Sequence, residues 1–343
     1  MQVCAARIYR DSAHVEPAPV AGTAPVAAKP SRIRRLTPHR ASAFLTGYVL
    51  ALVPDDPRVL QITALGFLLA AGAYFRDFSL RSSQIALTFA AGLGLQRLLD
   101  ALLHKRAPTL RSATITSLST ALLLRSDNLW AHPVAAAAAI ASKFLIRRRS
   151  KHLFNPANFG VVAVLMLLPG TWVSPGQWGG DVATAGWLVA LGMSVAGRAR
   201  RADISLLFLV FYLGALAARV AWLGQGWAVW THQLQSGALL LFAFFMISDP
   251  MTTPNHALGR VAHAAFVAAV SYAWAFGLFR ANAVLWALFV TAPAVCVWDA
   301  IWPASAYQWQ HGGIPDEKIT ECKEPEAGTA GAGTLLVRVR CAG

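Results

Sequence analysis

Charged residues and cysteines are scarce in this sequence of 343 residues. Charged side chains make up 13% of the chain, whereas soluble proteins carry roughly a quarter. The four cysteines, Cys4, Cys296, Cys322 and Cys341, show no CxxC or other metal-ligand spacing, and the histidines are equally scattered. We therefore expect neither a soluble domain, nor a disulfide framework, nor a metal or iron–sulfur centre.

Signatures of common enzymes are missing as well. The sequence contains no Gly-rich phosphate loop, no HExxH motif and no nucleophile elbow. Nothing in it therefore indicates a kinase or a hydrolase. The N-terminal arginines are not followed by an apolar segment with a small-residue cleavage site, so we expect no removable signal peptide.

Apolar residues dominate instead, at 56% of the chain, together with 12 tryptophans. Several apolar runs approach the roughly 17–25 residues that cross a bilayer. The net charge of +14 comes from Lys and Arg in short clusters between these runs. That is the positive-inside pattern of membrane loops, so we expect no nucleic-acid partner. The sequence predicts an all-α polytopic membrane protein, with the lipid bilayer as its first partner.

We expect about ten transmembrane helices, judged by the length needed to span a bilayer. They lie near 58–75, 82–103, 112–125, 129–146, 157–170, 183–197, 203–222, 235–248, 261–278 and 282–301. A disordered basic arm at 1–41 precedes this membrane domain (42–302), and a polar tail at 303–343 follows it. The basic clusters fall on one side when both termini are cytoplasmic, which predicts a multi-pass protein of the bacterial inner (plasma) membrane.

Two Ser-Asp breaks divide the expected spans into matching halves. Ser126-Asp127 ends the third span and Ser248-Asp249 ends the eighth, each with a proline a few residues later. Phe154-Asn155-Pro156-Ala157-Asn158 and Phe279-Arg280-Ala281-Asn282 likewise open the fifth and tenth. We expect two five-helix repeats, at about 57–170 and 183–302, related by inversion because an odd number of spans separates them.

Both expected third spans are short, and this predicts where a site would form. Each has roughly 14 residues, or ~21 Å of helix, against a hydrocarbon core of ~30 Å. Such a helix ends within the membrane, and its freed backbone groups need partners from protein, water or ligand. A binding site between the halves follows from this arrangement.

The segment from Ser236 to Thr252 carries the most specific candidates. Ser236 and Gly237 open the eighth span and allow a backbone to approach closely. Asp249-Pro250 ends this span, because proline fixes φ and has no amide donor. Thr252 can bond the freed carbonyls or a ligand.

Acidic and amide side chains near the breaks have two interpretations. Asp127 and Asp249 are either cation or proton sites, or turn residues that bond nearby amides. Asn155, Asn158 and Asn282 are either helix N-caps or part of helix starts that present amides to a phosphate or an anionic flavin. For Asn282 we expect capping alone. Ser126 belongs to the first break, and by symmetry with the second break it is a candidate cofactor-binding residue.

Several of these motifs resemble one known family. Ser236-Gly237-Ala238, an apolar run, Asp249-Pro250-Met251-Thr252 and Gly259-Arg260 are similar to the membrane subunits RnfD and NqrB of the Rnf and sodium-pumping NADH:quinone oxidoreductase complexes. Ser142-Lys143 followed by Phe154-Asn155-Pro156-Ala157 also resembles that family. The similarity covers roughly residues 57–302. The strings SKHLFNPANFG and WVSPGQWG are still more similar to a shorter branch, the UnbU-like proteins of enediyne-type biosynthetic clusters.

The resemblance implies a ten-helix inverted-repeat fold, binding of flavin (FMN or riboflavin), and electron transfer coupled to sodium or proton movement. In that family FMN is attached to a threonine in a Ser-x-Ala-Thr motif, within a long outer loop after the fifth span. Here the loop at 171–182 is short, and only Ala183-Thr184 matches. Thr184 is therefore either a covalent flavin site or an ordinary helix-start residue, and we expect a non-covalent flavin.

The expected function is a membrane subunit of an Rnf/Nqr-type electron transport system. It would act with other membrane or peripheral electron-transfer subunits, and hold its flavin near Ser236, Asp249-Pro250 and Asn155-Pro156. One alternative is an inverted-repeat transporter or channel for a small polar molecule, since paired short helices are typical of transporters. Another is an accessory membrane protein of a biosynthetic cluster.

Overall fold

The computed structural model describes residues 56–75, 81–103, 110–148, 151–173 and 182–308. All of these residues lie in one compact unit. The expected basic arm at 1–41, and the tail beyond residue 308, lie outside the described residues.

Helices make up most of the described chain. The first group comprises α2 (Pro57–Phe75), α3 (Ser82–Leu103), α4 (Arg111–Leu123), α5 (Ala131–Leu145) and α6 (Pro156–Leu167). The second comprises α7 (Val182–Arg198), α8 (Ala202–Trp222), α9 (Ala228–Leu234), α10 (Gly237–Leu241), η2 (Phe242–Met246), α11 (Ala257–Tyr272), η3 (Ala273–Gly277), α12 (Ala283–Thr291) and α13 (Ala294–Ile301). The segments η2 and η3 are π-helical continuations of α10 and α11.

Each apolar run read from the sequence coincides with a helix or with a pair of consecutive helices. Two helices of the described chain, Ser82–Leu103 and Ala202–Trp222, are long and apolar enough to cross a membrane by themselves. Helices α12 and α13, bent by 52° at their junction, form a third candidate if taken as one span. The fold is mostly helical, and its apolar helices are consistent with a membrane protein.

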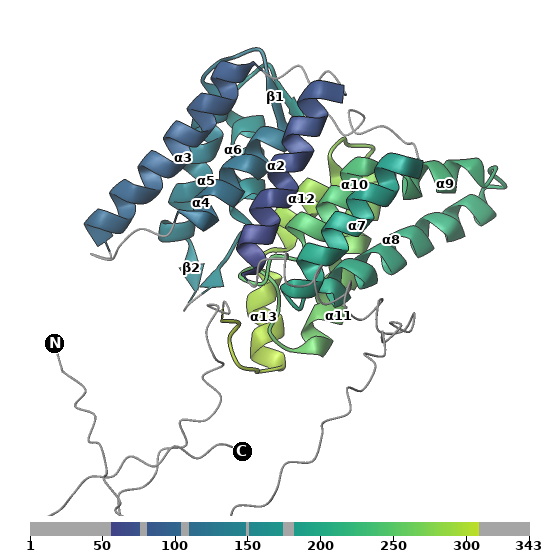
Figure 1. Cartoon of the computed structure of the whole chain (residues 1–343). Helices are drawn as coiled ribbons and strands as arrows, with labels where there is room; N and C mark the ends of the chain where they lie inside the picture. The colour runs from purple at the N-terminus through teal and green to yellow at the C-terminus, as the bar shows by residue number, and fades with distance from the viewer. Residues whose placement is uncertain (1–55, 76–80, 104–109, 149–150, 174–181, 309–343) are drawn as a thin grey trace, which may run out of the picture. The chain divides into compact units, whose positions relative to one another are not determined.

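The helices pack as two groups that differ in colour in Figure 1, the first running from purple to blue-teal and the second from teal to yellow. In the first group α3 and α6 pack against α5, and α2 packs against α4. In the second group α8 and α12 pack against α11, and α7 packs against α10 and η2. The groups meet where α2 contacts α7 and where α6 contacts α12.

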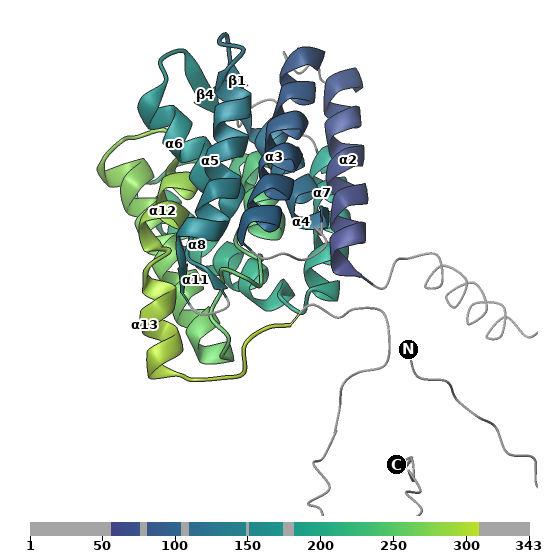
Figure 2. The same cartoon turned by 90° about the vertical axis from the view of Figure 1, so that its left-hand side faces the viewer.

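Two short strand pairs lie at opposite ends of the helices (Figures 1 and 2). Strand β1 (Leu124–Ser126) follows α4 directly and pairs antiparallel with β4 (Thr171–Val173). Strands β2 (Arg147–Arg148) and β3 (Lys151–His152) form the hairpin between α5 and α6. Each pair satisfies backbone groups at a place where a helix has just ended.

The segment α10–η2 lies at the centre of the core. Every residue from Leu239 to Ile247 is at most 5% exposed. Gly192 of α7 permits this burial, because a Cβ at that position would lie 2.4 Å from Phe244 Cβ. The central helix therefore ends, at Met246, inside the protein rather than at its surface.

Candidate functional site

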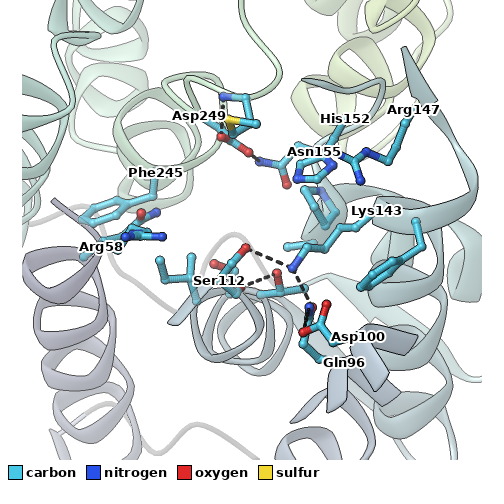
Figure 3. Close-up of a pocket in the computed structure, with 18 residues that line it drawn as sticks. Arg58, Gln96, Asp100, Ser112, Lys143, Arg147, His152, Asn155, Phe245 and Asp249 are labelled. Atoms are coloured by element: carbon cyan, nitrogen blue, oxygen red, sulfur yellow. Dashed lines mark hydrogen bonds between the residues drawn. The ribbon is translucent and has the colours of Figure 1, made fainter. Parts of the chain in front are cut away.

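A cavity of about 270 Å³ lies at the buried end of η2 (Figure 3). It is bounded by the start of α2, the end of α3, the starts of α4 and α6, the end of α5 and the turn after η2. Its polar or charged lining residues include Arg58, Gln96, Asp100, Ser112, Lys143, Arg147, His152, Asn155 and Asp249. Segments distant in sequence thus supply one site.

Lys143 is the most unusual group of this cavity. It lies in the last turn of α5 and is only 5% exposed. Its Nζ donates to Gln96 Oε1 and to Ser112 Oγ, at 3.0 Å each. Within the described chain, no carboxylate lies at ion-pair distance from this ammonium. A buried cation held only by neutral groups is costly, and a bound anion would offset that cost.

The turn after η2 brings a carboxylate to the same cavity. Asp249 Oδ1 accepts from the Met251 amide at 3.0 Å, and Oδ2 accepts from Asn155 Nδ2 at 3.5 Å. Burial raises the pKa of Asp249, whereas the Met251 bond and the charges of Lys143 and Lys151 lower it, with the balance above its usual value. The cavity therefore holds a carboxylate that gains a proton more readily than one in water.

Asn155 joins this turn to the start of α6. Its Oδ1 accepts from the Asn158 amide at 3.1 Å, so it is the N-cap predicted from the sequence. Its Nδ2 also donates to Met246 O at 3.3 Å, the carbonyl at the last residue of η2. Pro156 occupies the first position of α6. Asn158 lies inside α6, where Nδ2 donates to Leu285 O of α12 at 3.1 Å.

Further charges surround the cavity. Arg58 pairs with Asp56 at 2.9 Å, and Arg111 pairs with the same carboxylate. Burial opposes ionisation of Asp56, but the hydrogen bonds and charge of Arg58 and the charge of Arg111 outweigh it and lower its pKa. Burial, assisted by the charges of Lys143 and Arg147, lowers the pKa of His152 to about 3. This histidine is therefore neutral at pH 7.

The other candidates from the sequence lie elsewhere. Ser236 is at the opposite end of the α10–η2 segment, with Gly237 buried beside it. Ser236 lines a smaller cavity of about 190 Å³, together with Tyr212, Gln233 and Asn282. Ser236 and Asp249 therefore line separate cavities. Pro250 and Thr252 are buried in the turn beside Asp249, where Thr252 Oγ1 donates to Asp249 O at 3.2 Å.

The first Ser-Asp break builds no comparable cavity among the described residues. Ser126 Oγ donates to Gly170 O at 2.9 Å, and Ser126 O accepts from Gln84 Nε2 at 2.8 Å. Asp127 is exposed. Thr184 is partly buried in the first turn of α7 and does not line the main cavity. The structure therefore gathers Asn155, Pro156 and Asp249, but not these three residues.

The prediction that Asn282 caps its helix is wrong. Asn282 precedes α12 with φ 56° and ψ 34°, in the left-handed region, and its side chain makes no capping bond. An N-cap side chain reaches the amides ahead of it from an extended backbone. Asparagine suits this position instead because it tolerates the left-handed conformation.

Sequence reasoning missed most of the cavity lining. In the sequence Lys143 stands out mainly as part of the Ser142-Lys143 motif, although a lysine inside an apolar run is itself a signal of function. Gln96 and Ser112 carry no such signal, since polar neutral residues are common in helices. Their importance comes from their contact with Lys143, which joins α3, α4 and α5.

A small apolar gap of about 10 Å³ lies between the main cavity and the cavity of Ser236 and shares lining residues with each. Ser119 and Phe245 line both this gap and the main cavity. Leu123 and Met246 line both the gap and the cavity of Ser236. The three spaces follow one another between α4 and the α10–η2 segment.

Comparison with known proteins does not assign this chain to a family. No protein-family model matches the chain, and no curated protein matches it.

Proposed function

We propose that this chain is a membrane subunit of an electron-transport system of the Rnf/Nqr type, and that it binds FMN or riboflavin non-covalently in the main cavity. The observation that carries the proposal is the buried ammonium of Lys143, which faces a cavity and bonds only to neutral Gln96 and Ser112. An anionic ligand would balance the positive charge of this ammonium. The identity of that ligand as a flavin comes from the sequence resemblance.

The lining suits a flavin in chemistry. Lys143, Arg58 and Arg147 supply charge for a phosphate or for an anionic ring, and the start of α6 adds amide dipoles. Phe144 and Phe245 supply apolar surface for a flat ring. The volume of about 270 Å³ lies just below the range of about 300–1,000 Å³ for ligand pockets. The fit is therefore tight, and it favours part of the cofactor lying outside the cavity.

In this role the protein binds and positions, and the flavin supplies the redox chemistry. Lys143 would stabilise negative charge on the ligand, and its bonds to Gln96 and Ser112 would hold the ammonium in place. Asp249 would hold or release a proton at its carboxyl group beside the ligand. Electrons would come from, and pass to, partner subunits.

We also propose the ten-span inverted repeat, in a bacterial inner membrane with both termini cytoplasmic. Corresponding helix pairs are in contact in the two groups. The contact between α2 and α4 corresponds to that between α7 and α10–η2. In the same way, the α3–α5 contact corresponds to α8–α11, and the α5–α6 contact corresponds to α11–α12. The groups meet through α2–α7 and α6–α12, which are themselves corresponding helices. A two-fold axis in the membrane plane accounts for this pattern.

A second candidate function is transport of a small polar molecule or ion. The line of cavities between α4 and α10–η2 favours it, because the charge-lined main cavity and the mostly apolar cavity of Ser236 lie on either side of an apolar constriction of about 10 Å³. Such constrictions gate channels by excluding water. The same path would serve ion movement coupled to electron transfer.

An absorption spectrum of the detergent-purified full-length chain separates the two functions. A flavin band close to stoichiometric supports the redox subunit, and its complete absence from protein freshly prepared from native membranes contradicts it. In Lys143→Met we expect flavin content to fall about tenfold, the usual effect of losing a charged hydrogen bond. Ser142→Ala is the matched control, since Ser142 Oγ bonds only within its own helix, to Ala139 O.

In-gel fluorescence after denaturation tests the covalent alternative at Thr184. We expect the denatured chain to show no flavin fluorescence, because Thr184 does not line the main cavity and a non-covalent flavin separates from the unfolded protein. A fluorescent band that disappears in Thr184→Ala would instead establish the covalent link.

A further inference from the structure

A larger cavity, of about 420 Å³, lies on the other side of the β2–β3 hairpin. Its walls are the hairpin, the turn that precedes α11, helix α13 and the segment that follows α13. His152 lines both this cavity and the main one, so the hairpin separates two polar spaces. The hairpin also divides its arginines, since Arg147 lines the main cavity and Arg148 lines this one.

The charges of this second cavity leave an excess of one cation. Its lining contains Arg148 and Lys151, with Asp299 as its one carboxylate among the described residues. Lys151 Nζ donates to Asp299 Oδ2 at 3.0 Å, and Asp299 Oδ1 accepts from the Asn255 amide at 2.8 Å. The carboxylate is therefore already used on both oxygens. Arg148 contributes a positive charge that Asp299 does not balance.

Two buried polar atoms of the lining have no hydrogen-bond partner, His152 Nδ1 and Asn255 Oδ1. Buried polar groups in native proteins are nearly always paired. Both residues belong to the lining of the cavity, so a rotation of their side chains toward it would let a ligand or ordered water pair with these atoms. In its Nδ1–H tautomer His152 donates from this atom. Rotation of the Asn255 amide exchanges its oxygen for a donor nitrogen.

We propose that this second cavity binds a phosphate group, held by Arg148 and Lys151 and by hydrogen bonds from His152 and Asn255. Several donors around a surplus positive charge match the acceptor oxygens of a phosphate. A metal cation does not suit the site, because its only carboxylate in the described lining is occupied. The phosphate belongs either to an anionic phospholipid at the membrane surface, where basic pockets between helices bind such headgroups, or to a soluble molecule.

Protection of Cys296 from alkylation measures occupancy, because this thiol lines the cavity. The experiment uses the full chain with Cys4→Ser, Cys322→Ser and Cys341→Ser, in nanodiscs of phosphatidylcholine or of phosphatidylglycerol, with and without inorganic phosphate. We expect a bound phosphate to slow alkylation, and Arg148→Gln to weaken this protection about tenfold as one charged contact is lost. Because Arg148 itself interacts with the Cys296 thiol, each variant is compared with the same variant in phosphatidylcholine without phosphate. Arg81→Gln, which removes an exposed arginine at the start of α3, should leave the protection intact.

The two sources give different results. Protection in phosphatidylglycerol without added phosphate identifies a lipid headgroup, whereas protection in phosphatidylcholine only after phosphate is added identifies a soluble ligand. Equal alkylation rates under all conditions, or protection that persists in Arg148→Gln, overturn the proposal. Flavin content of the same samples is a separate readout: we expect Arg148→Gln to retain it, so failure of the flavin proposal and failure of this one are distinguishable.

Discussion

The two Ser-Asp breaks share a sequence pattern but differ in what they build. At the first, β1 pairs with β4, Ser126 bonds to Gly170, and Asp127 points to solvent. At the second, the chain turns through Pro250 without a strand, and Asp249 lies against the main cavity. At the first break the strand pair satisfies the backbone, and neither Ser126 nor Asp127 lines any of the cavities described above. At the second break side chains satisfy the backbone, and Asp249 lines the main cavity.

The residue before each serine explains part of this difference. Arg125 is 1% exposed, and its guanidinium donates to the carbonyls of Ala121, Leu122 and Leu124. It therefore caps α4 from within and fills the space at the helix end. Ile247 holds the equivalent place in the second break and has no donor to offer. There Asn155, from another element, bonds Met246 O instead.

The largest effect we expect comes from Gly192→Val, which should displace η2 and lower the stability by about 3 kcal/mol or more, as overpacking does in well-packed cores. A Cβ at Gly192 would lie 2.4 Å from Phe244 Cβ. Thermal melting in detergent measures the loss. Gly66→Ala in α2 is the control, because a Cβ there meets nothing within 4 Å. Equal melting of both variants would mean that η2 does not depend on this contact.

Arg125→Leu should destabilise the first break by about 2 kcal/mol, because buried carbonyls lose their donors. Ile247→Leu, at the equivalent place in the second break, should cost less than about 1.5 kcal/mol as a volume-conserving change. Melting temperatures of the two variants give the comparison. An Arg125 variant as stable as the parent would show that the strand pair β1–β4 is enough to stabilise the end of α4 without the guanidinium.

Asn155→Ala should cost about 1 kcal/mol through loss of the N-cap of α6, and should also reduce flavin content. Asn282→Gly should leave stability within about 0.5 kcal/mol of the parent, since glycine accepts a left-handed φ without strain. Melting and the flavin absorbance of the purified proteins measure both effects. Similar losses from the two substitutions would contradict the different roles found for these asparagines.

The smallest effect concerns Asp249 and depends on pH. The pKa of this carboxyl is raised in the folded state, so the folded protein holds the proton more tightly than the unfolded chain does. The stability of the protein therefore falls as the pH rises from about 4, the unfolded pKa, through the folded pKa. Asp249→Asn should therefore raise the melting temperature at pH 7 and lose this advantage in acid. Asp127→Asn, at an exposed site, should stay within about 0.5 kcal/mol of the parent.

Some of the molecule could be predicted from the sequence because the signals are local. Apolar runs bounded by proline, glycine and arginine placed the helices, and the Asn-Pro pair at 155–156 predicted the cap of α6, which the structure confirms. The shortness of α4 and of α10–η2 followed in the same way. The left-handed Asn282 was not foreseen, because an asparagine before a helix is compatible with both conformations.

Hydropathy and backbone-breaking residues act over a few positions, so a helical, apolar chain with two interrupted segments could be predicted from the sequence. Which interruption lines the main cavity depends on tertiary packing, and so does the position of Ser236 and Asp249 at opposite ends of one buried segment. Tertiary packing also brings Gln96, Ser112 and Lys143 together from three helices. The physical reason is that a buried charge is accommodated by groups arriving from distant parts of the chain, and no local pattern records their meeting.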